Sequence, residues 1–259
     1  MVEIVQLEKN LEACLMQLKR EYGLCAVKAE FEAEGATFRD LVRLRRWTAR
    51  QDIALHLKIG GVEALRDIKD ALDLGVDGLI APMVESPFGV TKFTEAVGSV
   101  FSGRDVYKSI NIETRTAVLH IDDILTEAKG KVDNVTIGRT DLSHSYFDAE
   151  VKPDCDFISD LIQTISYKVR AVGLALTLGG SITAQSINQL RKNREDLEGR
   201  IYSIETRKII LPIESFLAKK GALEEALRFE ELYLHAKLET EQLLSQVDRN
   251  RLAKLKSRI

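Results

Sequence analysis

The sequence has few of the features that mark secreted, membrane-spanning or nucleic-acid-binding proteins. Its 259 residues include only three cysteines, and no two of these have CxxC spacing. This excludes a cysteine-based metal set and favours a reduced compartment. No apolar run approaches the roughly 18 residues that cross a bilayer, and we find no signal peptide. The formal net charge is −3, so no polyanion-binding surface is indicated. We therefore expect a cytoplasmic protein that binds neither membranes nor nucleic acid.

The chain does contain a regular alternation of strand-like and helix-like segments. Strands are predicted near residues 24–31, 52–59, 76–84, 108–113, 133–138, 171–178 and 201–211. Strands without strict polar alternation, separated by helices, favour a parallel sheet covered by helices. The pattern predicts an α/β fold, a (β/α)8 TIM barrel, although only seven strands are found. Either a modified first strand lies within residues 1–30 or the barrel is incomplete. An open doubly wound sheet is the competing fold.

The pattern changes after Pro212. A helix is predicted from Gly221 to about Ser257, longer than most helices of globular proteins. We expect two parts, a barrel with its N-terminal helix over residues 1–212 and a C-terminal helical extension over residues 213–259. The extension could pack on its own barrel. Its length and basic end favour packing on a neighbouring subunit.

Two carboxylates each follow a strand-like run, 28 residues apart. Glu113 ends the run from Ser109, and Asp141 follows the run from Asn134, with an amphipathic helix near residues 117–128 between them. Parallel strands joined by a helix bring both strand ends to the same rim. Two acidic oxygens that face one another suit a hard divalent cation. Glu113 and Asp141 are therefore the predicted metal ligands.

Three segments in register resemble one protein family. They are Ala81-Pro82-Met83-Val84-Glu85-Ser86, Ile112-Glu113-Thr114 and Ile137-Gly138-Arg139-Thr140-Asp141-Leu142-Ser143. Over roughly residues 28–210 their order and spacing are similar to those of the HpcH/HpaI aldolase and citrate lyase beta-subunit family, in the phosphoenolpyruvate/pyruvate barrel superfamily. The resemblance implies a barrel with Mg²⁺ or Mn²⁺ on Glu113 and Asp141. There the metal chelates a 2-oxo acid and stabilises the enolate of carbon–carbon bond cleavage. Related enzymes form hexamers with exchanged C-terminal helices, which implies a homo-oligomer, trimer or hexamer.

The resemblance also implies substrate-binding residues. Lys58 takes the position of a family arginine that contacts the substrate, and it keeps the charge without the bidentate fork. Asn111 lies where family aldolases often place a glutamine beside the substrate. The loop of Gly138, Arg139 and Thr140 corresponds to the one whose backbone amides hold the substrate carboxylate. Amide donors at such a turn suit an anion.

This chain lacks the histidine that the resemblance implies for proton transfer. The aldolases have a Glu-His pair after an early strand, with the histidine as general base, but this chain has Gly35 there. His144 is the best histidine to replace it. Glu30, Glu32 and Glu34 alternate, so we expect them to share one face of an extended strand end. Glu32 and Glu34 are therefore candidate catalytic residues.

A charged segment, Glu205-Thr206-Arg207-Lys208, lies on the last predicted strand. Charges on a strand are unfavourable unless they lie at the mouth of the barrel or are paired. Arg207 is accordingly a predicted substrate-binding residue, and it could relieve the repulsion among the early glutamates.

Three functions remain open from the sequence. The first is a metal-dependent lyase or aldolase that acts on a 2-oxo acid such as pyruvate or oxaloacetate. The second is a metal-independent aldolase in which Lys58 is a catalytic, imine-forming nucleophile. The third is an inactive barrel that serves as a binding or assembly subunit. No GxGxxG motif, P-loop or Cys/His metal set is present, so no other cofactor is expected.

Overall fold

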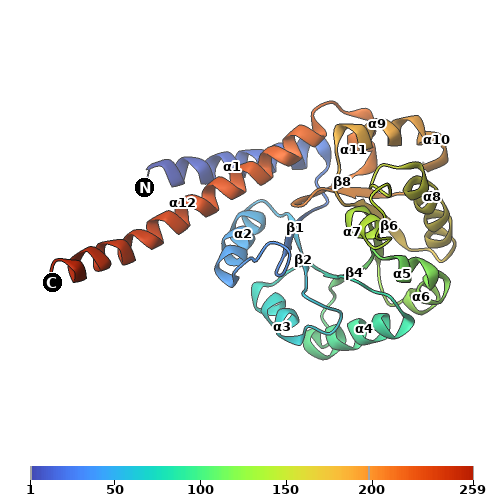
Figure 1. The fold of residues 1–259 in the computed structure, drawn as a ribbon, viewed down its shortest axis with the longest axis horizontal. Helices are drawn as coiled ribbons and strands as arrows, with labels where there is room; N and C mark the ends of the chain where they lie inside the picture. The colour runs from blue at the N-terminus through green and yellow to red at the C-terminus, as the bar shows by residue number, and fades with distance from the viewer. Residues whose placement is uncertain (1, 198, 259) are drawn as a thin grey trace.

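The chain forms a closed barrel of eight strands with helices around it (Figure 1). The computed structural model describes residues 2–197 and 199–258. The strands are β1 (Ala26–Glu30), β2 (Ala54–Lys58), β3 (Gly78–Ala81), β4 (Tyr107–Ile112), β5 (Asn134–Gly138), β6 (Ala175–Gly179), β7 (Ser203–Glu205) and β8 (Ile209–Pro212). The predicted barrel is confirmed, and the open doubly wound sheet is excluded.

The barrel departs from the expected topology at its last strand. Strands β1 to β7 pair in parallel, whereas β8 runs antiparallel to both β7 and β1. The single strand predicted over residues 201–211 is therefore wrong, because it is a hairpin. The three residues 206–208 between its strands are too few for the crossover that parallel strands need. The first strand is regular over Ala26–Glu30, so the expected modification lies at the eighth strand instead.

Helices follow most of the strands and cover the barrel. They are α2 (Phe38–Arg50), α3 (Leu65–Leu74), α4 (Pro87–Phe101), α5 (Arg115–Leu119), α6 (Ile121–Ala128), α7 (Arg139–His144), α8 (Asp156–Ala171), α9 (Ala184–Lys192), α10 (Arg194–Leu197) and α11 (Ile213–Ala218). Thr37 begins α2 with a capping box to Asp40, and Ser86 caps α4, as expected for these residue types. The helix predicted over residues 117–128 is divided at His120 into α5 and α6.

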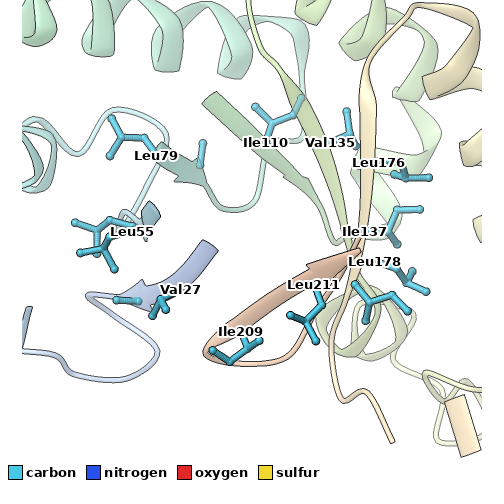
Figure 2. Close-up of a cluster of buried hydrophobic side chains, with 14 of the residues drawn as sticks. Val27, Leu55, Leu79, Ile110, Val135, Ile137, Leu176, Leu178, Ile209 and Leu211 are labelled. Atoms are coloured by element: carbon cyan, nitrogen blue, oxygen red, sulfur yellow. The ribbon is translucent and has the colours of Figure 1, made fainter. Parts of the chain in front are cut away.

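The hydrophobic core lies between the strands and the surrounding helices. Alternate strand residues such as Val27, Leu55, Leu79, Ile110 and Val135 are fully buried (Figure 2). Because successive strand residues point to opposite faces, the residues between them face the barrel axis. Many of these are polar and hydrogen-bonded to one another, as in the 2.8 Å contact between the hydroxyls of Thr177 and Ser203. The barrel axis is therefore polar, and it leads to the charged groups at the carboxyl ends of the strands.

His56 belongs to the opposite end of this axis. Its ring stacks on Tyr107 with 4.8 Å between centroids, and Gly78 leaves room for it. Both aromatic residues line a cavity with Asn134, the first residue of β5. Burial lowers the pKa of His56 to about 4, so the ring is neutral at neutral pH. The amino-terminal ends of the strands, and not the carboxyl ends, therefore hold this histidine.

Two long helices, α1 (Val2–Tyr22) and α12 (Ala222–Lys256), lie side by side along one edge of the barrel (Figure 1). Leu15 and Leu18 of α1 are buried, as are Phe229 and Tyr233 of α12. The last turns of α12 extend beyond α1 and expose large apolar side chains, at Leu238, Leu243, Leu244, Val247, Leu252 and Leu255. Among the described residues, no helix combines the length and the apolar composition that a membrane span requires.

Candidate active site

A cavity of about 390 Å³ opens at the carboxyl ends of the parallel strands. The structure brings seven of the predicted site residues to its wall: Lys58, Asn111, Glu113, Gly138, Thr140, Asp141 and Arg207. The lining also includes Glu30 and Glu205, which the sequence singled out only as members of charged segments, and Lys28 and Glu230, which it did not single out. Charged groups on a wall this crowded have to be paired or bind a ligand.

Glu113 lies directly after β4 and is only 2% exposed. Its Oε1 accepts a hydrogen bond from the Met83 amide at 2.9 Å, and its Oε2 accepts one from Asn111 Nδ2 at 3.1 Å. A Cβ at Gly138 would lie 2.5 Å from Glu113 Oε2, so the glycine is what allows the carboxylate to lie over β5. Burial raises the pKa of Glu113, Lys58 opposes the rise and Asp141 adds to it. The two predicted ligands therefore affect one another electrostatically.

Asp141 belongs to α7, the short helix that starts directly after β5, rather than to a strand end. Its residue is exposed and lines the cavity. No described residue donates a hydrogen bond to its carboxylate. The carboxylate is therefore free to bind a ligand from the cavity.

The donor atoms at this edge of the cavity fit a hard divalent cation. Glu113 and Asp141 provide carboxylate oxygens. Asn111 adds a buried Oδ1 that has no hydrogen-bond partner among the described residues, and the residue is 3% exposed. An all-oxygen set is what Mg²⁺ and similar cations prefer. Within the described chain no group of three or more His, Cys, Asp or Glu residues forms a metal-binding arrangement. Two carboxylates would leave coordination positions open to water and substrate.

A chain of buried ion pairs covers the opposite side of the cavity. Lys28 Nζ lies 2.7 Å from Glu205 Oε1 and 3.0 Å from Glu30 Oε1, and Lys58 Nζ lies 3.4 Å from Glu30 Oε2. Burial alone would lower the pKa of Lys28, but Glu205 and Glu30 outweigh it and raise the pKa. Burial alone would raise the pKa of Glu30, but the positive charges of Lys28 and Lys58 outweigh it and lower the pKa. Lys28 and Glu30 are therefore held in their charged forms.

Sequence reasoning missed Lys28. One signal for it was present, because Lys28 and Glu30 alternate within a strand of otherwise apolar residues and so share its inner face. Their partner Glu205 lies 177 residues away from Lys28 along the chain, and no local pattern identifies it.

The backbone amides of Arg139 and Thr140 face the place that Gly180 leaves open. A Cβ at Gly180 would lie 2.7 Å from the Arg139 nitrogen and 2.5 Å from the Thr140 nitrogen. The Arg139 side chain points elsewhere, to Asp154 at 2.6 Å and to the carbonyl of Gly180 at 2.7 Å. The two amides can therefore bind an anion, while the Arg139 guanidinium holds the loop of Gly180 and Ser181 in place.

The predicted arrangement of Glu30, Glu32 and Glu34 is wrong. β1 ends at Glu30, and residues 31–35 form a turn, so the three side chains do not share a strand face. Glu34 pairs with the buried Lys208, and Glu32 lies against Gly60. Neither lines the cavity, so the structure does not bring these two candidates to the site. His144 is exposed on α7 and is also absent from the cavity wall.

Arg207 lies in the turn between β7 and β8. Since β7 is parallel to the strands before it, this turn lies at their carboxyl ends, and Arg207 reaches the cavity wall. Its side chain is 51% exposed, and its Nε lies 4.0 Å from Glu230 Oε1 of α12. Leu227 of α12 lines the cavity beside them. The hairpin and α12 thus form the outer wall of the cavity.

Comparison with solved structures gives neighbours that share this fold. A HpcH/HpaI aldolase/citrate lyase family protein from Burkholderia cenocepacia J2315 is 18% identical with a TM-score of 0.60, covering 84% of this chain and 90% of its own. The HpcH/HpaI aldolase from Desulfitobacterium hafniense DCB-2 is 18% identical with a TM-score of 0.59, and the match covers 74% of this chain and 80% of that one. A citrate lyase from Burkholderia xenovorans LB400 is 12% identical with a TM-score of 0.62, and the match covers 89% of this chain and 79% of that one. At these identities the likeness shows the fold alone.

Comparison with curated proteins gives no match. The family model of HpcH/HpaI aldolase/citrate lyase matches residues 40–197, more than half of the chain, and this range includes Glu113, Asp141 and the junction of β5 and α7. The chain therefore belongs to the HpcH/HpaI aldolase/citrate lyase family.

Proposed function

We propose that this protein is a carbon–carbon lyase or aldolase that acts on a 2-oxo acid with Mg²⁺ or Mn²⁺ at Glu113 and Asp141. The observation that carries the proposal is the convergence of these two carboxylates and the unpartnered Asn111 Oδ1 on one cavity. Five carboxylates and three cationic side chains line that cavity. With all of them ionised, one divalent cation would balance their charge.

The side chains around the proposed metal site have distinct roles in binding a 2-oxo acid. When bound, the metal supplies a Lewis acid that polarises a carbonyl and stabilises negative charge on its oxygen. The amides of Arg139 and Thr140 bind the substrate carboxylate in the space beside Gly180. Lys58 adds a positive charge on the opposite side, where Glu30 orients it. Arg207 extends this binding surface at the outer wall.

The alternative of an imine on Lys58 is disfavoured by its ion pair. An imine-forming amine must be free to attack a carbonyl, and Lys58 Nζ is engaged by Glu30 Oε2 at 3.4 Å. The oxygens near Glu113 would also have no function in an imine mechanism. The metal route therefore accounts for more of the cavity.

A chelation and trapping experiment separates the two routes. We expect EDTA to remove the activity on pyruvate-derived 4-hydroxy-2-oxo acids, and Mn²⁺ to restore it. We also expect borohydride with pyruvate to leave no adduct on Lys58 in peptide mass mapping. Activity that survives EDTA, together with reductive trapping on Lys58, would contradict the metal-dependent proposal.

Residues 213–236 of the predicted extension over residues 213–259 pack on their own chain, and we further propose that its end beyond Leu238 packs on a second copy of this chain in a homo-oligomer. The exposed apolar side chains of α12 beyond Leu238 support this proposal, because a helix that contacts only its own chain would not need them. Removing residues 239–259 should lower the mass measured by light scattering to that of a monomer. An unchanged mass would contradict it.

A further inference from the structure

We propose that Glu205 is the catalytic residue that transfers the substrate proton; this inference rests on the proposed function. Metal-assisted cleavage of a 2-oxo acid needs a group that accepts a proton and returns it, in addition to the Lewis acid. The structure points to Glu205 by its free oxygen, its place at the end of β7 and its position relative to Glu113.

The other ionisable groups on the cavity wall are already engaged. Both oxygens of Glu30 contact ammonium groups, so protonation there would break two ion pairs. Lys28 is held between two carboxylates, and an arginine such as Arg207 does not lose its proton. Glu113 and Asp141 are the proposed metal ligands. Two carboxylates remain, Glu205 and Glu230.

Glu205 has one fixed oxygen and one free oxygen. Lys28 holds Oε1 at 2.7 Å. Oε2 accepts no hydrogen bond from the described residues and is not among the fully buried, unpartnered oxygens. Since Glu205 lines the cavity, Oε2 is open to it. Glu230, by contrast, is on α12 in the outer wall and faces Arg207.

A pair of glycines places Glu205 near Glu113. Gly138 and Gly179 are partners in the register of β5 and β6. Glu113 lies over Gly138 from β4, and Glu205 lies over Gly179 from β7, where a Cβ would be 2.8 Å from the Glu205 Cγ and Oε1. Neighbouring strands are about 4.8 Å apart, so the two carboxylates lie over adjacent strands of the same cavity. A substrate bound to a metal at Glu113 would therefore lie beside the free oxygen of Glu205.

The proposed step transfers one proton and no net electrons. Glu205 Oε2 accepts a proton from the methyl carbon of pyruvate. As the C–H bond breaks, its electron pair forms the C2–C3 double bond, and the carbonyl π pair moves to the carbonyl oxygen. The proton on Glu205 then returns to carbon or exchanges with water. In cleavage of a 4-hydroxy-2-oxo acid, Glu205 first takes the hydroxyl proton as the C3–C4 bond breaks, and later protonates C3.

Methyl exchange isolates this step from the rest of catalysis. In D₂O with Mg²⁺, NMR follows the loss of the pyruvate methyl protons for wild type, Glu205→Gln and Glu205→Asp. We expect Glu205→Gln to slow exchange by about 100-fold or more, and Glu205→Asp to restore part of it. Binding of Mn²⁺ and of oxalate, measured by calorimetry, should be unchanged in both variants. Glu32→Gln is the matched control, because Glu32 lies outside the cavity, and it should exchange as wild type does.

A second variant tests the placement without changing the carboxylate. Gly179→Ala should displace Glu205 and slow exchange while Mn²⁺ still binds. Wild-type exchange rates in Glu205→Gln would overturn the assignment, as would loss of exchange in Glu230→Gln alone. Absence of Mn²⁺ binding and of exchange in the wild-type protein would instead overturn the proposed function, and this assignment with it.

Discussion

Replacing Glu113 by glutamine is expected to abolish both metal retention and turnover. The change removes the negative charge and replaces one oxygen by an amide nitrogen that would face the donors Met83 N or Asn111 Nδ2. Changes in the groups that merely support metal ligands already cost 10–100-fold in affinity or activity. We therefore expect a loss of Mn²⁺ affinity of more than about 100-fold, measured by electron paramagnetic resonance.

The matched control for this change is Glu85→Gln. Glu85 is exposed at the rim, accepts a hydrogen bond from Thr114 at 2.6 Å and does not line the cavity. It should bind Mn²⁺ as wild type does. If Glu113→Gln keeps wild-type metal affinity in a folded protein, Glu113 is not a metal ligand.

Replacing Lys28 by methionine is expected to cause a large loss of stability. It removes the ammonium that lies between Glu205 and Glu30 and leaves two buried carboxylates facing one another. Breaking a buried ion pair by removing one partner costs about 3–5 kcal/mol. Urea unfolding at pH 7 measures the change.

The pH dependence of that loss provides an internal check. Without Lys28, burial and mutual repulsion raise the pKa of the carboxylates above their unfolded values. A group with a raised folded pKa contributes least at high pH, so the deficit of Lys28→Met should shrink as the pH falls from 7 to 5. Lys168→Met, which removes a largely exposed ion pair of 2.6 Å with Asp122, should cost less than about 1 kcal/mol. A similar small cost for Lys28→Met would show that the buried network does not stabilise the fold.

Local sequence patterns were sufficient to predict most of the barrel. The alternation of buried strands with amphipathic helices gave its class. The rule that parallel strand ends meet at one rim placed Glu113 and Asp141 at the same cavity. Those inferences depend on neighbours in sequence and on the order of strands.

The errors arose where distant contacts decide the structure. The hairpin after Glu205 contains neither glycine nor proline in its turn, so residues 201–211 resembled one continuous strand. Pairing with β1 decides that β8 turns back. Likewise, Glu34 does not line the cavity, because its carboxylate pairs with Lys208, which lies far along the chain. A pattern of alternating glutamates does not contain that information.

The antiparallel β8 has a consequence for how the chain assembles. β8 is the strand that covers the second edge of β1, so during synthesis that edge stays unpaired until nearly the whole protein has left the ribosome. A free strand edge is a template for pairing with other chains. A chain that terminated before residue 209 would therefore expose the unpaired edge of β1 and be prone to aggregate. Closure of the barrel by β8 must be among the last events of folding.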